Sequence, residues 1–142
     1  MTTITVYAKP VTQGSVTAIP VRRKSGKMGA VAIHNHSVEL YEQRAIIQSE
    51  YRKAGGQYYE TEAVEIEMVF SFIRPKSVKE KKRPYMTVKP DTDKCIRAVL
   101  DSLTNVAYKD DCQVVSIKAV KIYGEQEYTQ IRLERYGETV SS

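Results

Sequence analysis

The chain has 142 residues, and its 22 Lys and Arg against 17 Asp and Glu give a formal net charge of +5. With 42% hydrophobic and 27% charged residues, its composition is that of a globular domain and excludes a disordered chain. No apolar run approaches the roughly 18 residues of a membrane span, and the start has no signal-peptide layout. We therefore expect one soluble, cytoplasmic domain over residues 1–142, with no membrane partner and a polyanionic one.

The N-terminal part is predicted to contain a strand, a long loop and a helix. Residues 2–8 alternate β-branched or aromatic residues with others, which is typical of a strand. Residues 9–36 are interrupted by prolines and glycines and are predicted to form an irregular basic loop. Its basic cluster can bind phosphates or simply be solvated, and consists of Arg22, Arg23 and Lys24. Residues 37–54 are predicted to be helical, with Leu40, Ile47 and Tyr51 on one stripe.

A long strand followed by a second basic loop is predicted in the middle of the chain. Residues 64–72 alternate apolar and polar side chains with a period of two, which indicates a strand with one buried face. Residues 74–90 carry three prolines and only one acid, so they are predicted to be a loop that is either solubilising or bound to a phosphate backbone. Its basic residues are Arg74, Lys76, Lys79, Lys81, Lys82, Arg83 and Lys89.

The last third is predicted to add a helix and two strands. Helical spacing of apolar residues runs from Asp93 to about Val106. Residues 114–122 look apolar on both faces and are predicted to be a central strand, whereas residues 128–136 interleave polar side chains as expected nearer an edge. Residues 137–142 are expected to be a frayed tail. The fold class is therefore α+β with a mixed sheet, in the order β-α-β-α-β-β.

Two acidic pairs flank the second predicted helix. Asp91 and Asp93 stand at its N-terminus, where the helix dipole favours anions, and Asp93 can serve as the N-cap. Asp110 and Asp111 precede the next strand, and we expect one or both to reach the first pair. Carboxylates that converge without His or Cys suit a hard cation, Mg²⁺ or alternatively Mn²⁺, of the kind used in phosphoryl transfer. Acidic pairs are also common on surfaces, so this signal alone is weak.

Arg97 has both a functional and a purely structural interpretation, whereas the two cysteines are interpreted as structural. Arg97 lies one turn after Asp93 and can neutralise charge that develops on a phosphate. Asp93, Arg97 and Asp101 are equally well spaced for ordinary helical ion pairs. The two cysteines, Cys95 and Cys112, are expected to be reduced and to act as small buried hydrophobic residues.

The run from Lys89 to Val114 resembles the signature of the RusA-type Holliday junction resolvases. The similarity rests on the Lys-Pro-Asp-x-Asp run at its start, on a patterned helix, and on the Asp-Asp-x-Gln-Val run at its end. Its residues are Lys89, Pro90, Asp91, Asp93, Ala98, Leu100, Asp101, Leu103, Asp110, Asp111, Gln113 and Val114. The resemblance implies a homodimeric, Mg²⁺-dependent endodeoxyribonuclease that cuts two opposed strands of four-way DNA junctions. It places the essential aspartates at Asp91, Asp93 and Asp111, with Asp110 adjacent.

This sequence departs from that family pattern at two positions. Lys94 stands where the family usually has Asn, and Arg97 stands where it has a catalytic Lys. Arg keeps the charge but is planar and bulkier. The leading hypothesis is a junction-resolving nuclease of recombination and repair, with Asp91, Asp93, Asp111 and Arg97 as catalytic residues. The alternatives are a branched-DNA-binding protein that has lost cleavage, with Lys94 and Arg97 as phosphate contacts, and a general flap or branched-DNA nuclease.

Overall fold

The computed structural model describes residues 1–13, 16–22, 28–34 and 37–137, which form a single α+β domain. The elements in chain order are β1 (Thr2–Val6), β2 (Val16–Arg22), β3 (Met28–His34), α1 (Ser37–Lys53), β4 (Val64–Phe72), α2 (Thr92–Leu103), the short 3₁₀ helix η1 (Asp111–Gln113), β5 (Val114–Tyr123) and β6 (Tyr128–Arg135). Apart from the added pair β2 and β3, this is the predicted order of strands and helices. The predicted tail lies outside the described residues from residue 138 onward.

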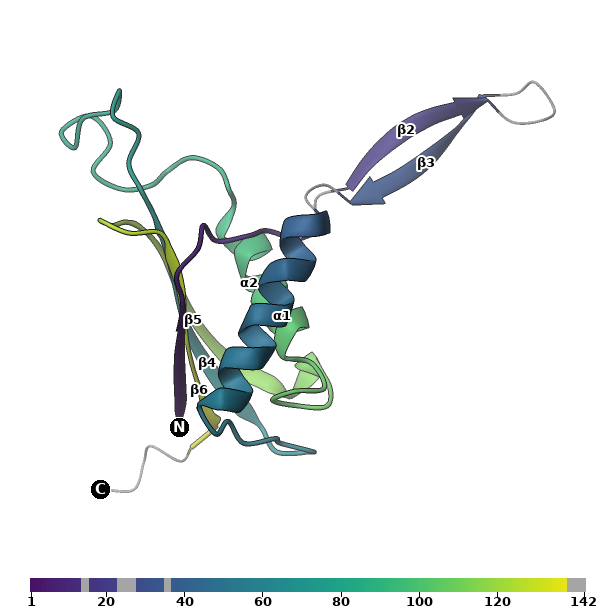
Figure 1. The fold of residues 1–142 in the computed structure, drawn as a ribbon, viewed down its shortest axis with the longest axis vertical. Helices are drawn as coiled ribbons and strands as arrows, with labels where there is room; N and C mark the ends of the chain where they lie inside the picture. The colour runs from purple at the N-terminus through teal and green to yellow at the C-terminus, as the bar shows by residue number, and fades with distance from the viewer. Residues whose placement is uncertain (14–15, 23–27, 35–36, 138–142) are drawn as a thin grey trace.

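Four strands form a mixed sheet in the order β1-β6-β4-β5. Strand β4 is parallel to β5 and antiparallel to β6, and β1 is antiparallel to β6. A parallel pair needs a crossover connection, and α2 provides it between β4 and β5. Figure 1 shows α1 and α2 side by side on one face of the sheet, which leaves the opposite face without helices. The sheet therefore has one buried and one open face.

The core lies between the sheet and the two helices. Strand β4 is predicted correctly, and its alternate side chains Ile66, Met68 and Phe70 are each only 1% exposed. The helices contribute the predicted stripe of α1, in which Leu40, Ile47 and Tyr51 are buried, together with the buried Val99 and Leu103 of α2. Burial of large apolar side chains from both layers, at about 1.5–3 kcal/mol each, holds α2 firmly against the sheet. This packing fixes the helix that carries the first acidic pair.

The prediction of an irregular loop over residues 9–36 is wrong. Residues 16–22 and 28–34 form β2 and β3, which pair antiparallel in a separate two-stranded sheet. Pro20 favoured the prediction of a loop, because proline is excluded from the central strands of a sheet. Both strands of a two-stranded sheet are edges, where a missing backbone N–H is tolerated. In Figure 1 this pair lies apart from the four-stranded sheet.

The predicted positions of the last two strands in the sheet are reversed. Strand β5 is an edge strand and β6 is internal, between β1 and β4. The polar residues of β6 interleave because the open face of the sheet takes Gln130 and Arg132, while Ile131 and Leu133 are buried on the helix face. Alternation of polar and apolar residues therefore indicates a strand with one buried and one exposed face, and it does not indicate an edge strand. On β5, conversely, Val115 is 57% exposed, so apolar residues there do not all lie in the core.

Helix α2 is shorter than predicted at its C-terminus and begins one residue earlier. It ends at Leu103 rather than near Val106, and Asn105 adopts a positive φ of 68° that a helix cannot continue through. The N-cap residue is Asp91, not Asp93, and its side chain makes no capping hydrogen bond. The Asp91 carboxylate is therefore not engaged by the helix amides that it precedes.

The two cysteines have different environments. Both are free; Cys95 is fully buried in α2, whereas Cys112 is exposed, so the prediction of two buried thiols holds for Cys95 only. Burial raises the pKa of the Cys95 thiol to about 11, with smaller effects from Lys121, Asp93 and Asp91. Among the helices of the described ranges, none is long and apolar enough to cross a membrane.

Candidate functional site

The first acidic pair lies at the N-terminus of α2. Asp91 is the N-cap in extended conformation, with φ −72° and ψ 140°, and Asp93 is in the first helical turn. Both side chains are exposed. The N-terminal end of the helix carries a partial positive charge that stabilises nearby anions by about 0.3–1 kcal/mol each. The structure thus presents two solvent-accessible carboxylates, two residues apart, at an end that favours negative charge.

Two basic residues of the same helix accompany this pair. Lys94 Nζ lies 3.6 Å from Asp91 Oδ2, and both side chains are partly exposed, at 31% and 48%. An ion pair of this kind contributes about 0–1 kcal/mol. Arg97 follows one turn after Asp93 and is exposed. The Lys94 ammonium is therefore the group that neutralises Asp91, while Arg97 is accessible to a ligand.

The basic loop between β4 and α2 is held at two of its arginines. Arg74 stacks over the Tyr123 ring with 4.7 Å from its Cζ to the ring centroid, and it donates from Nη2 to the Pro84 carbonyl at 3.3 Å. Arg83 Nη1 donates to the Tyr123 hydroxyl at 3.2 Å. The lysines of the loop are exposed, and these are Lys76, Lys79, Lys81, Lys82 and Lys89. Of the predicted DNA-binding residues, the lysines are thus free for phosphates and the two arginines also support the loop.

Tyr123 and Lys121 are residues that the sequence pattern did not single out. Both lie at the end of β5, about 30–50 positions from the loop residues that they contact. No pattern in the sequence indicates their role, because they occupy alternate positions of a strand and are interpreted as part of its packing. The remaining predicted phosphate ligands belong to the other basic segment: Arg22 is the last residue of β2, and Arg23 and Lys24 lie outside the described residues.

The second acidic pair lies in the connection between α2 and β5. Asp110 is the N-cap of η1, and its side chain accepts a hydrogen bond from the Cys112 backbone N–H at 2.9 Å. This hydrogen bond lowers the pKa of Asp110. The pKa of Asp111 is raised, chiefly by desolvation and then by the neighbouring Asp110 and Asp101 carboxylates. The two adjacent aspartates therefore differ, since the Cys112 amide stabilises the charged form of Asp110, whereas desolvation and the nearby carboxylates disfavour the charged form of Asp111.

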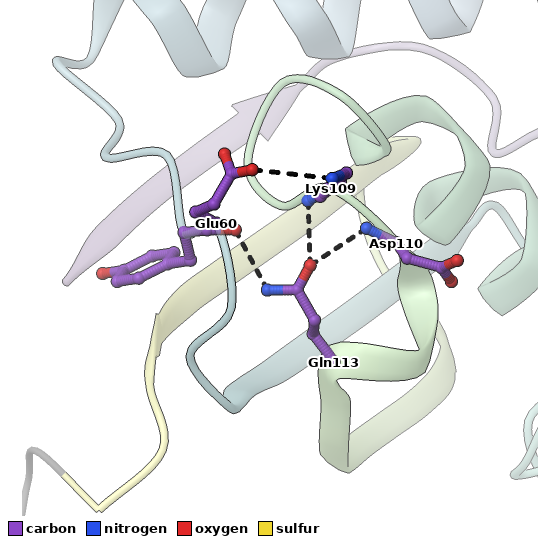
Figure 2. Close-up of polar contacts among 5 residues, drawn as sticks. Glu60, Lys109, Asp110 and Gln113 are labelled. Atoms are coloured by element: carbon purple, nitrogen blue, oxygen red, sulfur yellow. Dashed lines mark hydrogen bonds and ion pairs between the residues drawn. The ribbon is translucent and has the colours of Figure 1, made fainter.

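Gln113 holds the backbone around this second pair (Figure 2). Its Oε1 accepts from the backbone N–H groups of Lys109 and Asp110 at 2.9 and 3.0 Å. Its Nε2 donates to the carbonyls of Tyr59 and Glu62, both at 3.0 Å. An ion pair of 3.7 Å between Lys109 and Glu60 lies beside it. One side-chain amide thus ties the aspartate segment to the segment that leads into β4.

Replacing Gln113 by Leu is expected to destabilise the fold. The change leaves two backbone N–H groups and two carbonyls without this partner, and the partial exposure of the site limits the cost to about 1–3 kcal/mol of unfolding free energy. Urea denaturation followed by circular dichroism measures this loss. The matched control is Gln126→Leu at an exposed position, for which we expect less than about 0.5 kcal/mol. Equal unfolding midpoints for the two variants would contradict the role of Gln113.

The two acidic pairs lie at opposite ends of α2. In Figure 1 the basic loop and the start of α2 are at one end of the sheet, and the connection from α2 to β5 is at the other. The 12-residue helix between them is about 18 Å long at 1.5 Å per residue. Within the described ranges of the chain there is no group of three or more His, Cys, Asp or Glu suited to a metal ion. The expectation that one chain brings the pairs together is not met, and the four aspartates remain predicted ligands.

Comparison with known proteins gives two matches. The family model described as Endodeoxyribonuclease RusA matches residues 14–134. The protein YqaN of Bacillus subtilis (strain 168), which is described as uncharacterized, is 32% identical over 142 aligned positions, and these cover 91% of this chain and 92% of that protein. The family match extends from the segment before β2 nearly to the end of β6. It therefore includes both acidic pairs, the basic loop and Gln113.

Proposed function

Because the chain belongs to the RusA endodeoxyribonuclease family, we propose that it is a metal-dependent nuclease that resolves Holliday junctions by paired, symmetric strand cuts in recombination and repair. The observation that carries this proposal is the position of Asp91 and Asp93. They are exposed at the N-terminus of a helix, directly after a loop of exposed lysines. A DNA backbone bound by the lysines would pass beside the carboxylates.

The donor chemistry of the acidic residues suits a divalent cation. Asp91, Asp93 and Asp111, with Asp110 adjacent, offer only carboxylate oxygens, which Mg²⁺ and Mn²⁺ prefer over the nitrogen and sulfur ligands chosen by zinc. When bound, such an ion supplies positive charge at the phosphate and lowers the pKa of a water molecule. The ligand atoms that these residues offer are therefore of the type that Mg²⁺ or Mn²⁺ prefers, and Asp91 and Asp93 would form one half of the ligand set.

The basic residues have separate parts in this proposal. Lys79, Lys81 and Lys82 would bind phosphates of the DNA arms, with an affinity that falls steeply as salt increases. Arg97 would donate to the phosphate that is cut and neutralise the charge that develops on its oxygens, from a position one turn along α2 from Asp93. In this proposal the basic loop supplies the affinity for DNA, and helix α2 supplies the group that accelerates cleavage.

We further propose that the active form is a homodimer whose two-fold axis matches the symmetry of a four-way junction. The dimer would have a second role, because the acidic pairs lie at opposite ends of α2, a helix about 18 Å long. Two copies that pack with the start of one α2 beside the end of the other would place Asp91 and Asp93 of one copy next to Asp111 of its partner. Each site would then have three carboxylates.

A second candidate function is supported by the Lys94–Asp91 ion pair. An ammonium 3.6 Å from a proposed metal ligand competes with the cation for that carboxylate. A protein in which this competition prevails would bind branched DNA without cutting it, and Lys94 would serve as one more phosphate contact. This candidate shares the fold and the basic loop with the first, so binding alone does not separate them.

A labelled four-way junction incubated with the protein and Mg²⁺ tests the proposed function. We expect two nicks at symmetric positions that convert the junction to linear duplexes, and no cleavage in EDTA. Tight binding without nicks in either Mg²⁺ or Mn²⁺ would leave only the binding protein. Equal cutting of flap and junction substrates, with little cutting of duplex, would instead indicate a general flap or branched-DNA nuclease.

A further inference from the structure

Lys121 of β5 makes two hydrogen bonds to the segment that carries Asp91. Its Nζ donates to the Val88 carbonyl at 2.6 Å and to the Pro90 carbonyl at 2.8 Å. These carbonyls flank the Lys89–Pro90 peptide, and the second belongs to the peptide unit that contains the Asp91 amide. Because a peptide unit is planar, a bond that fixes the Pro90 oxygen also fixes the position of the Asp91 Cα. The ammonium therefore acts directly on the backbone of a proposed metal ligand.

The segment before Asp91 has few other attachments. Residues 73–91 form neither helix nor strand, and Thr87, Val88 and Lys89 are all exposed. Met86 is the buried side chain that anchors this part of the loop to the core. A loop with little apolar burial opens easily by local unfolding. Two charge-assisted hydrogen bonds from a strand of the rigid sheet are a strong restraint on such a segment.

The Lys121 ammonium lies near the start of α2, next to the Pro90 carbonyl that precedes Asp91. Cys95 lies one turn into α2, and Lys121, Asp91 and Asp93 all act electrostatically on its buried thiol. The buried Cys95 thiol thus lies within the electrostatic reach of the ammonium and of both carboxylates. Lys121 is partly buried, unlike the exposed lysines of the loop, and its hydrogen bonds go to carbonyls of this chain. Its position is that of an internal support rather than of a surface contact with DNA.

We propose that Lys121 is a positioning residue of the nuclease site, which holds the Val88–Pro90 backbone so that Asp91 and Asp93 keep the geometry a cation requires. This inference rests on the proposed function for its effect on cleavage. Its structural half, that Lys121 tethers the segment, stands independently. Loss of the tether leaves the lysines of the basic loop unchanged, so it acts on the rate of cutting and on metal binding rather than on DNA affinity.

The test uses Lys121→Met, Lys121→Arg and the control Lys118→Met in the full chain. Lys118 is on the same strand and is exposed, and it lies opposite Glu67 in the register of β4 and β5. Hydrogen exchange followed by mass spectrometry measures the peptide that spans residues 86–95, which includes the Cys95 amide bonded to the Asp91 carbonyl at 3.3 Å. We expect exchange in Lys121→Met to be faster by about ten-fold or more, the size of a lost charged hydrogen bond. Lys118→Met is expected to leave it unchanged.

Cleavage kinetics give the functional half of the test. For Lys121→Met we expect kcat on the junction to fall about ten-fold or more, a higher Mg²⁺ concentration for half-maximal rate, and an unchanged Kd for the junction in EDTA. Lys121→Arg keeps charge and donors and is expected to recover most of the rate and the exchange protection. Circular dichroism verifies that each variant is folded.

The outcomes separate the two proposals. Unchanged exchange at residues 86–95 in folded Lys121→Met, or a weaker junction Kd with unchanged kcat, would overturn the role of Lys121. If the wild-type protein does not cut junctions at all, the proposed function fails, and the exchange measurement still decides whether Lys121 is the tether.

Discussion

Asp93→Asn is expected to abolish junction cleavage while the protein still folds and binds DNA. The substitution removes a charged ligand and leaves an amide of nearly the same shape, and loss of one such electrostatic group costs about 10²–10³-fold in kcat. Asp93 is exposed in the first turn of α2, so the lost interaction with the helix dipole costs only about 0.3–1 kcal/mol of stability. Single-turnover cleavage of a labelled junction in Mg²⁺ measures the rate.

The same variant is expected to bind a junction in EDTA as tightly as the wild type or more tightly, because a negative charge near the phosphates has been removed. The matched control is Glu50→Gln on α1, which also removes one negative charge. Glu50 pairs with Lys53 at 3.7 Å on the surface of that helix. Full cleavage by the control with none by Asp93→Asn would assign the loss to the site. Normal cleavage by Asp93→Asn would remove Asp93 from the proposed ligand set.

Apart from β2 and β3, the strands and helices of this fold follow patterns that a single sequence contains. Strand β4 and the stripe of α1 bury apolar side chains at the expected periods, because each element packs against one layer only. The order of strands in the sheet, by contrast, does not follow from such local patterns. Whether β5 or β6 is internal depends on which strand pairs with β1, a contact between residues about 130 positions apart. The alternation within each strand is the same in either arrangement.

The residues of the candidate site remain a prediction from the sequence, and their spatial arrangement could not be predicted from it. Asp91 and Asp93 are recognisable because a Pro-Asp-x-Asp run before an amphipathic helix is a local pattern. The distance to Asp111 depends on the direction in which α2 runs. As the crossover between two parallel strands, α2 must run antiparallel to them, and this direction takes its two ends to opposite ends of the strands. The supports from Lys121 and Gln113 are likewise contacts between distant segments.

A mixture of two inactive variants is expected to regain cleavage if each metal site is shared between two copies of the chain. Asp93→Asn and Asp111→Asn would each inactivate both sites of a homodimer. In a mixed dimer, one site would carry both substitutions and the other would carry neither. Random exchange makes about half of the dimers mixed, and each has one of two sites intact, so total nicking should return to about a quarter of the wild-type rate.

The product distinguishes this arrangement from the alternatives. A mixed dimer with one intact site should nick one strand of the junction and release few linear duplexes, because resolution requires two opposed cuts. If Asp91, Asp93 and Asp111 instead act within one chain, each copy in the mixture has a defective site and no nicking returns. A second mixture, Asp93→Asn with Asp91→Asn, is the control: both changes fall at the same end of α2, so a shared site also remains inactive. Recovery in the first mixture and not in this control would assign the two ends of the helix to different halves of one site.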